Sequence, residues 1–505
     1  GLGDVYKRQY LYVLKTNIME NKISLLQPVE VWRHFEKLCA IPRPSGHLEK
    51  VTRYVVEFGR SLGLETIVDT AGNVLIRKPA TPGMENLRPV VLQAHLDMVP
   101  QKNGTVKHDF EVDPIRPYID GEWVKAQGTT LGADNGIGLS SILAVLESET
   151  LRHGPVEALF TNDEETGMTG ANGLKAGFLK GEILLNTDSE QEYEIYVGCA
   201  GGINIQASFR YRDEPVNSDN DEAYSITVSG LKGGHSGIDI HLGRANANKL
   251  LFRFLKEVVS DYEVRLSSVS GGNMRNAIPR EATAIVTLPS DDVPDFMEAV
   301  DEYARVLADE YALIEDGLSF KVEKAAMPST WIPEPVQDDL INAVVACHDG
   351  VLRRVPGAPD MIETSSNLAI VQSGDGAIDV TFLARSSSES MKAYLVSMIE
   401  STFLLAGARV ETSGGYPGWQ SDLNSPFLNV AKKVHHDTLG IDPQIMIIHA
   451  GLECGIIGEK YPEMEMISFG PTLRHPHSPD EKVEIASVGR YWKFLTALLE
   501  DIPEK

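Results

Sequence analysis

Cysteine, basic charge and long apolar runs are all scarce in this sequence, and each shortage argues against a class of protein. Four cysteines occur, Cys39, Cys199, Cys347 and Cys454, and they form no C-x-x-C pair. This usage argues against a disulfide framework and favours a reducing, cytoplasmic location. No stretch of about 18 apolar residues occurs, so we expect no membrane-spanning helix.

Positive charge is outnumbered throughout the chain. Lysine and arginine number 46 against 72 acidic residues, which gives a formal net charge of -26. This charge would repel a phosphate backbone, and no run rich in lysine or arginine reverses it locally, so we expect no nucleic-acid partner. Clustered carboxylates that bind divalent cations would offset part of the negative charge.

The composition is that of a folded globular protein with more than one domain. The chain has 505 residues, of which 42% are hydrophobic and 23% are charged, and this length exceeds what one ordinary core organises. The opening "GLGDVYKRQYLYVLKTNI" matches nothing later in style. We expect residues 1–18 to be a non-native leader and Met19 to be the initiator.

Strands and helices alternate in the first part of the chain. The short apolar runs "PVVLQAH", "VEALFTNDE" and "EILLNTD", separated by helical patterns, predict an α/β fold with a mostly parallel mixed sheet covered by helices on both faces. From residue 202, alternating strands such as "AYSITVSG" and "EATAIVTLP" predict an inserted α+β domain. We therefore predict a first domain from residues 19–201 and 414–505, and an inserted domain from residues 202–413. "NAIPREATAIVTLP" and "GDGAIDVTFLARSS" share a pattern that would fit two half-repeats within this insert.

Acidic and histidine side chains stand where the predicted strands end. They are His95, Glu164, Glu165, Asp188, His475 and His477, and the loop "GTTLGADNGIG" adds Asp134 ahead of a helix. Any one of them alone would most simply cap a turn or face solvent. In open α/β sheets, however, the carboxyl ends of the strands share one crevice. Carboxylates gathered there repel one another unless cations compensate, so the pattern predicts a metal centre.

The ligand types indicate a catalytic centre with two ions. Imidazole and carboxylate ligands without thiolates suit zinc, cobalt or manganese. So many anions fit a pair of ions about 3.5–4 Å apart that share one carboxylate. We assign Asp134 as the bridge and His95, Glu165, Asp188 and His477 as terminal ligands. Asp97 is placed to fix the imidazole of His95, and Glu164 is the candidate general base.

Eight motifs occur in an order that resembles a known family. They are "HLDMV", "GADNGIG", "TNDEETGM", "NTDSE", "GLKGGHSGIDIHLGRANA", "RNAIP", "HAGLECG" and "HPHSPDE". The chain from about Met19 to its end is similar to the co-catalytic zinc peptidases, the family that includes carnosinase and carboxypeptidase G. The resemblance implies one metal at His95 and Asp188, a second at Glu165 and His477, and Asp134 shared between them. It also implies a cis peptide bond after Asp134, and it favours His477 over His475 as the last ligand.

The resemblance also assigns roles to the insert, which becomes a lid over a catalytic first domain. His235, in a glycine-rich loop, would donate to the oxyanion of the attacked carbonyl, with Asn276 beside it; the alternative is a surface loop histidine. Arg385 would bind the substrate α-carboxylate, or would form a surface ion pair. Glu453 and His449 would line the pocket near the substrate amino end. We read His435 and His436 as exposed.

The expected function is that of a metallo-dipeptidase that cleaves dipeptides, including Xaa-His compounds such as carnosine, with water activated by Glu164 between two divalent ions. A tripeptidase or an N-acyl amino acid deacylase of the same fold is the alternative. A non-catalytic metal- or peptide-binding protein is a further one, against which the presence of Glu164 argues. Small peptides are the expected partners, and a homodimer through the lid is one arrangement that the resemblance allows.

Overall fold

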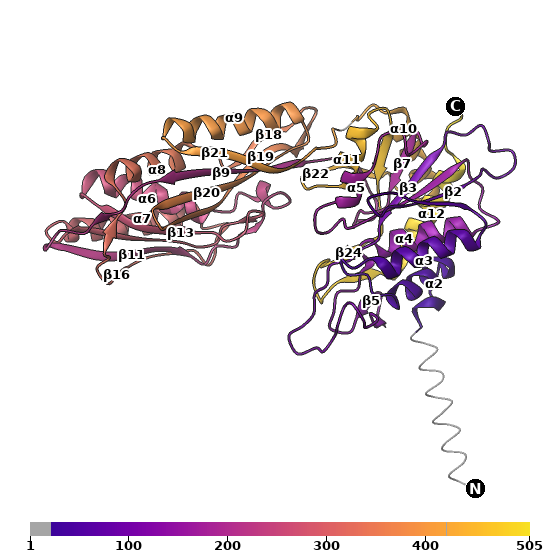
Figure 1. Ribbon diagram of the computed structural model, residues 1–505, viewed down its shortest axis with the longest axis horizontal. Helices are drawn as coiled ribbons and strands as arrows, with labels where there is room; N and C mark the ends of the chain where they lie inside the picture. The colour runs from indigo at the N-terminus through magenta and orange to yellow at the C-terminus, as the bar shows by residue number, and fades with distance from the viewer. Residues whose placement is uncertain (1–21, 421) are drawn as a thin grey trace, which may run out of the picture. The chain divides into compact units, whose positions relative to one another are not determined.

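The computed structural model describes residues 22–420 and 422–505, so the predicted leader lies outside the described residues (Figure 1). The chain divides into two compact units. The first unit runs up to Gly198 and includes Ser421–Met446 and Leu452–Lys505, and the second comprises Cys199–Gln420 and Ile447–Gly451. None of the described helices has the length and apolar character that crossing a membrane requires.

The first unit is built on an eight-stranded sheet. Its strands follow the order β1-β2-β6-β3-β7-β23-β8-β22. Their bounds are Glu65–Val68 (β1), Val74–Lys78 (β2), Val156–Thr161 (β6), Val90–His95 (β3), Ile183–Asn186 (β7), Glu465–Ser468 (β23), Glu194–Cys199 (β8) and Gln444–Ile448 (β22). The four central strands β6, β3, β7 and β23 run parallel, whereas β1, β2 and β8 pair antiparallel with their neighbours. The mixed, mainly parallel sheet that the sequence predicts is confirmed.

Helices cover the sheet of the first unit. Every residue of β3, β6 and β7 is buried, which requires cover on both faces. The helices are Val29–Cys39 (α2), Glu49–Ser61 (α3), Ala133–Glu147 (α4), Thr169–Gly173 (α5), Pro426–Leu439 (α10), Glu453–Lys460 (α11) and Ile485–Glu500 (α12). In Figure 1, α2, α3, α4 and α12 lie together on one side of the strands β3 and β2. The segment "IPRPSG" separates α2 from α3.

A small second sheet in the first unit presents the last predicted ligand. It has the order β24-β25-β5-β4, with bounds Leu473–Arg474, Lys482–Glu484, Trp123–Ala126 and Pro117–Asp120. β24 and β25 pair antiparallel and leave residues 475–481 as the loop between them. This loop carries both candidate histidines, His475 and His477.

The second unit is a nine-stranded antiparallel sheet covered by helices. The order is β16-β11-β15-β13-β19-β20-β9-β21, with β18 paired to β19. The strands are Gly201–Arg210 (β9), Asp221–Ser229 (β11), Arg265–Gly271 (β13), Ala282–Pro289 (β15), Ser319–Lys324 (β16), Gly350–Val355 (β18), Ala358–Gly374 (β19), Ala377–Ser386 (β20) and Arg409–Tyr416 (β21). The helices are Ala247–Asp261 (α6), Val293–Glu310 (α7), Glu334–Ala346 (α8) and Glu389–Leu405 (α9). Alternate residues of the strands join one apolar core with these helices.

Two halves of the second unit have the same topology. One half runs β11-α6-β13-β15-α7-β16 and the other runs β9-α8-β19-β20-α9-β21, and β13 pairs with β19 to join them. β15 and β20, which contain the two similar sequence patterns, are the third strand of their respective halves.

Two features of the sequence analysis need correction. The second unit extends past residue 413, because β21 continues to pair with β9 as far as Tyr416, and residues 447–451 join it through hydrogen bonds from the Ala200 N–H to the Ile448 and Ala450 carbonyls. His435 is buried rather than exposed. It lies on the apolar face of α10, where its ring packs against Phe494 and its Nδ1 lies 2.7 Å from the Ile441 carbonyl. His436 is exposed as predicted.

Candidate active site

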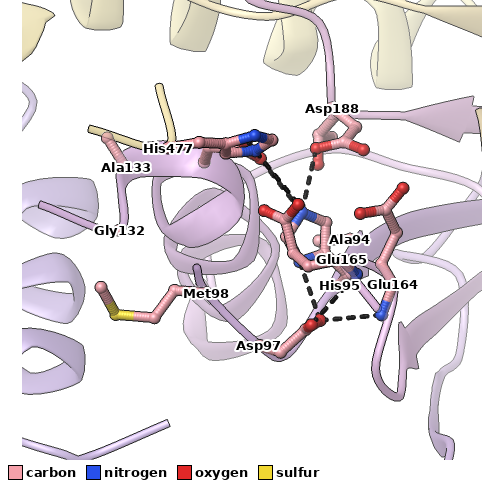
Figure 2. Close-up of polar contacts among 12 residues, drawn as sticks. Ala94, His95, Asp97, Met98, Gly132, Ala133, Glu164, Glu165, Asp188 and His477 are labelled. Atoms are coloured by element: carbon pink, nitrogen blue, oxygen red, sulfur yellow. Dashed lines mark hydrogen bonds and ion pairs between the residues drawn. The ribbon is translucent and has the colours of Figure 1, made fainter. Parts of the chain in front are cut away.

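Parallel strand ends bring four of the predicted residues to one place. β3 ends at His95, β6 ends at Thr161 just before Glu164 and Glu165, and β7 ends two residues before Asp188. His95 and Thr161 are partners in the parallel register, so the two strands stop level with each other. Figure 2 shows the side chains of these loops directed at a common centre together with His477.

Asp134 faces both histidines at once. Its Oδ1 lies 3.0 Å from His95 Nε2, and its Oδ2 lies 3.0 Å from His477 Nε2. Asp188 Oδ1 lies 3.3 Å from the same nitrogen of His95, and Glu165 Oε2 lies 3.0 Å from the same nitrogen of His477. The five side chains thus form two groups of three that share Asp134. The peptide bond between Asp134 and Asn135 is cis.

Asp97 organises the second side of His95. Its Oδ1 lies 3.2 Å from His95 Nδ1, and its two oxygens accept the backbone N–H groups of Glu164 and Glu165 at 3.0 and 3.1 Å. Ser45 donates a further hydrogen bond at 2.7 Å. A carboxylate on Nδ1 leaves Nε2 of the ring as the atom that faces the centre.

Glu164 reaches the same centre without a partner of its own. One of its oxygens lies within 4.8 Å of ligand atoms of His95 and Glu165. In Figure 2 its carboxylate points away from Asp97, toward the side on which Asp188 lies. Burial and the nearby carboxylate of Asp188 raise the pKa of Glu164 well above its ordinary value, which suits a group that accepts and returns a proton.

The electrostatics of the cluster call for positive charge. Burial, followed by repulsion from Asp134 and Glu165, raises the pKa of Asp188 to about 7. Hydrogen bonds to Asp134 and Glu165 raise the pKa of His477 to about 11. Although burial acts in the opposite direction, the carboxylates around His95 raise its pKa well above the ordinary value. A divalent cation between these groups would replace the protons that they otherwise hold.

The donor set fits divalent metals. Each group of three contains one imidazole nitrogen and two carboxylate oxygens, all within 4.8 Å of one another, which is a ligand set for zinc, cobalt or manganese. Glu165 Oε1 is buried and has no hydrogen-bond partner, as expected of an oxygen that would bind a cation. The His477 side chain is 51% exposed, so solvent reaches the cluster. His475 belongs to none of these groups among the described residues.

The second unit holds the predicted substrate-contact residues other than Glu453. His235 Nδ1 accepts the N–H groups of Gly237 and Ile238 at 3.1 and 3.0 Å, so the ring proton resides on Nε2, which is a donor. Burial, followed by the charge of Arg385, lowers the pKa of His235 to about 4 and keeps the ring neutral. Asn276 is exposed, and its backbone carbonyl accepts the Ser236 N–H at 2.9 Å.

Arg385 and His449 lie beside this loop. A Cβ placed on Gly237 would lie 3.1 Å from Arg385 Nε and 2.0 Å from the His449 carbonyl. Arg385 is buried, donates to the Tyr416 hydroxyl at 3.0 Å and leaves its Nε without a partner. His449 Nε2 lies 2.7 Å from Ser365 Oγ, and its Nδ1 is also unpartnered. Arg385 is therefore no surface ion-pair residue, and its Nε and His449 Nδ1 are two buried nitrogens without a hydrogen-bond partner.

Glu453 occupies the first unit below the ends of β3 and β6. It is fully buried, and its Oε2 accepts hydrogen bonds from Gln93 and Thr161, each at 2.6 Å. Its Oε1 has no partner, and burial raises the pKa of the carboxyl to about 7. Its predicted place at the substrate amino end stays a prediction.

Three charged residues around the centre were not identified from the sequence. Burial, with Asp134 and Asp188 close by, raises the pKa of Glu190 to about 8. Arg43 and Glu481 are buried next to the loops that carry the candidate ligands. Glu190 and Glu481 end motifs that resemble the family, "NTDSE" and "HPHSPDE", which was an available signal. Arg43 lies in "IPRPSG", a segment that reads only as a helix breaker.

Fold and site together define a metal-dependent hydrolase, and comparison with known proteins gives its family. Residues 91–501 match the model of peptidase family M20/M25/M40. The chain belongs to this family, whose peptidases depend on divalent metals, and it is a hydrolase of peptide bonds.

Two relatives match nearly the whole chain. The cytosol non-specific dipeptidase of Escherichia coli strain K12 is 48% identical over 485 residues, which cover 96% of this chain and 100% of that protein. The crystal structure of aminoacylhistidine dipeptidase from Vibrio alginolyticus is 48% identical, with a TM-score of 0.89 over 96% of this chain and 98% of that one. Aminopeptidase PepT from Bacillus cereus, at 14% identity and a TM-score of 0.55 over 94% of this chain and 99% of that one, shares the fold.

Proposed function

We propose that this chain is a cytosolic dipeptidase that works with two divalent ions, with zinc as the first candidate and cobalt or manganese as alternatives. The observation that carries the proposal is the position of Asp134, whose two oxygens face different histidines. The two relatives named as dipeptidases, each 48% identical over almost the full chain, support the substrate class. The word cytosol in the first relative's name supports the location.

The residues of the first unit would divide the metal ligation and the proton transfer between them. His95 and Asp188 would hold one ion, His477 and Glu165 would hold the other, and Asp134 would be a ligand of both. When bound, the ions would polarise the scissile carbonyl and lower the pKa of water, so that water could lose a proton and act as a nucleophile near neutral pH. Glu164 takes the proton from the attacking water and passes it to the leaving amine. Asp97 keeps His95 Nε2 directed at the centre through its contact with Nδ1.

Side chains of the second unit would recognise the carboxylate end of the substrate. Arg385, with its unpartnered Nε, binds the substrate α-carboxylate. His235 donates from Nε2 to the developing oxyanion, because its Nδ1 already accepts two N–H groups. A free carboxylate near the scissile bond is a property of dipeptides, so this assignment favours them over longer peptides. The predicted homodimer through the second unit stays a prediction, which light scattering of the purified chain would test.

A substrate panel tests the proposal. The purified chain would be stripped with a chelator, reloaded with Zn²⁺, Co²⁺ or Mn²⁺, and assayed on Xaa-His and other dipeptides, tripeptides and N-acetylated amino acids. Cleavage of dipeptides that depends on reloading is the expected result. Preference for tripeptides or N-acetylated amino acids would instead favour the tripeptidase or deacylase alternatives.

The variant Glu164→Gln separates catalysis from binding. It should lose about 10²–10⁴-fold in kcat, the usual contribution of a general base, while it keeps its bound metal. Glu182→Gln, a matched change at an exposed ion pair with Arg88, should leave both properties unchanged. Full activity in Glu164→Gln would exclude its assigned role.

A further inference from the structure

Two buried charged residues beside the metal centre have no place in the chemistry described so far. Arg43 and Glu481 are each only 2% exposed. Among the described residues, neither side chain forms a hydrogen bond or ion pair with the side chains of the five candidate ligands. Because burial of a charge is costly unless its hydrogen bonds are satisfied, the partners of these two residues indicate what they do.

Glu481 collects the backbone N–H groups of the loop that leads to Asp134. Its Oε2 accepts from Leu131 and Gly132 at 2.7 and 3.0 Å, and its Oε1 accepts from Ala133 and Asp134 at 2.8 and 3.3 Å. These donors lie at the start of α4, where N–H groups have no partner within the helix. Both oxygens of one carboxylate therefore fix the backbone immediately before the candidate bridging ligand.

Arg43 ties the same loop to the end of β3. Its Nη1 donates to the carbonyls of Leu96 and Asp97 at 3.1 and 2.7 Å, and its Nη2 donates to the carbonyl of Gly132. Gly132 has a φ of 71°, and a Cβ there would lie 2.7 Å from Arg43 Nη2. Only glycine fits this contact, since a side chain would both strain the backbone and displace the guanidinium.

The two residues together join three segments that each carry a candidate ligand. Glu481 lies four residues after His477 in the loop between β24 and β25, so its bonds hold that loop against the segment of Asp134. Arg43 holds the segment of Asp134 against the carbonyls that follow His95. All three segments belong to the first unit.

We propose that Arg43 and Glu481 are positioning residues that set the register of the three loops, so that Asp134 can face His95 and His477 at the same time. This inference rests on the proposed function, because it takes these three residues as metal ligands. In this arrangement the position of Asp134 depends on hydrogen bonds from the buried side chains of Arg43 and Glu481 to the backbone. It does not depend on contacts of these two residues with the ligand side chains. Without either residue, Asp134 should no longer face both histidines at once. The terminal pairs, His95 with Asp188 and His477 with Glu165, should stay in place.

The variant Glu481→Gln tests the inference directly. The amide replaces one acceptor oxygen by an N–H group that must face backbone donors, so two of the four hydrogen bonds are lost. We expect the affinity for both metal equivalents to fall about 10–100-fold, the usual effect of losing a group that supports ligands, because Asp134 faces both histidines. Titration of the chelator-stripped protein with Zn²⁺ by calorimetry measures this change, and the visible absorption spectrum of the Co²⁺-loaded protein reports the coordination.

Matched variants control the experiment. Glu484→Gln changes a carboxylate in the same segment that pairs with Arg490 at 3.2 Å, and it should leave metal affinity and the Co²⁺ spectrum unchanged. Arg43→Lys keeps the charge but cannot reach three carbonyls with a planar fork, and it should weaken both metal equivalents, as Glu481→Gln does. kcat should fall in both variants with KM nearly unchanged.

Three outcomes would overturn the inference. Wild-type affinities and an unchanged Co²⁺ spectrum in Glu481→Gln would reduce Glu481 to a stabiliser of the fold, even if the thermal midpoint fell. Failure of both Glu481→Gln and Arg43→Lys to fold would also count against it, because the pair would then serve the fold as a whole. Weakening of only one metal equivalent, with the other at its wild-type affinity, would show that the pair does not act on the shared ligand. A wild-type chain that binds fewer than two metals would instead contradict the proposed function.

Discussion

The carboxylate of Asp97 accepts the backbone N–H of Glu164 at 3.0 Å. The same carboxylate contacts the ring of His95, so one side chain fixes a candidate metal ligand and the loop of the candidate base. Burial acts against ionisation here, yet the hydrogen bond with His95 lowers the pKa of Asp97 to about 2. Asp97 is therefore a carboxylate at any pH at which the enzyme would work.

Replacing Asp97 by asparagine should weaken the whole centre. In Asp97→Asn an amide N–H₂ takes the place of one oxygen that now accepts an N–H of Glu164 or Glu165. We expect metal affinity to fall about 10–100-fold, with a parallel loss in kcat at limiting metal. Ser45→Ala removes only the hydroxyl donor to Asp97 and should have a far smaller effect. Equal metal affinity in Asp97→Asn and wild type would refute the supporting role.

The two histidines of the loop between β24 and β25 give a paired test. His477→Ala removes a nitrogen that lies 3.0 Å from both Asp134 and Glu165, and we expect metal content measured by mass spectrometry to drop from two equivalents to one. His475→Ala changes a residue two positions away, which belongs to none of the groups of possible metal ligands among the described residues. This variant should keep two equivalents of metal. Retention of both metals by His477→Ala would show that the ligand assignment is wrong.

His449 makes stability depend on pH in a defined direction. Burial, followed by the charge of Arg385, lowers its pKa from 6.5 to about 3. The unfolded chain then binds more protons than the folded chain between these values. This residue therefore reduces the free energy of unfolding as the pH falls from about 6.5 toward 3, by at most about 1.4 kcal/mol per pH unit.

The variant His449→Gln should flatten that dependence. Glutamine keeps an amide near Ser365 Oγ, the partner of His449 Nε2, and it does not titrate. Thermal unfolding between pH 6.5 and 4, measured side by side with wild type, should show a smaller decline in the variant. Parallel pH profiles for the two proteins would mean that His449 is not held neutral by its surroundings.

Ligand positions could be predicted from sequence because they follow a local rule. His95, Glu165 and Asp188 come directly after apolar runs, and parallel strands place such ends together whatever the helices do. Burial of His435 also follows from a local pattern, in this case helical spacing, and it was missed. Phe427, Ala431 and Val434 are buried on one face of α10, and His435 continues that face at helical spacing.

Other features depend on contacts that no local pattern carries. Arg43 donates to backbone carbonyls 53, 54 and 89 residues away along the chain. Because every residue has a backbone carbonyl, the sequence does not show which carbonyls accept these bonds. The end of the second unit depends on the length over which β21 pairs with β9, because alternation alone does not say where a ladder stops. These contacts are set by tertiary packing.

Anomalous diffraction from crystals of the Zn²⁺-loaded chain tests the shared role of Asp134 most directly. We expect two zinc peaks about 3.5–4 Å apart, one bound by His95 and Asp188, the other by His477 and Glu165, with one oxygen of Asp134 on each. A single peak, or two peaks without Asp134 between them, would contradict this assignment.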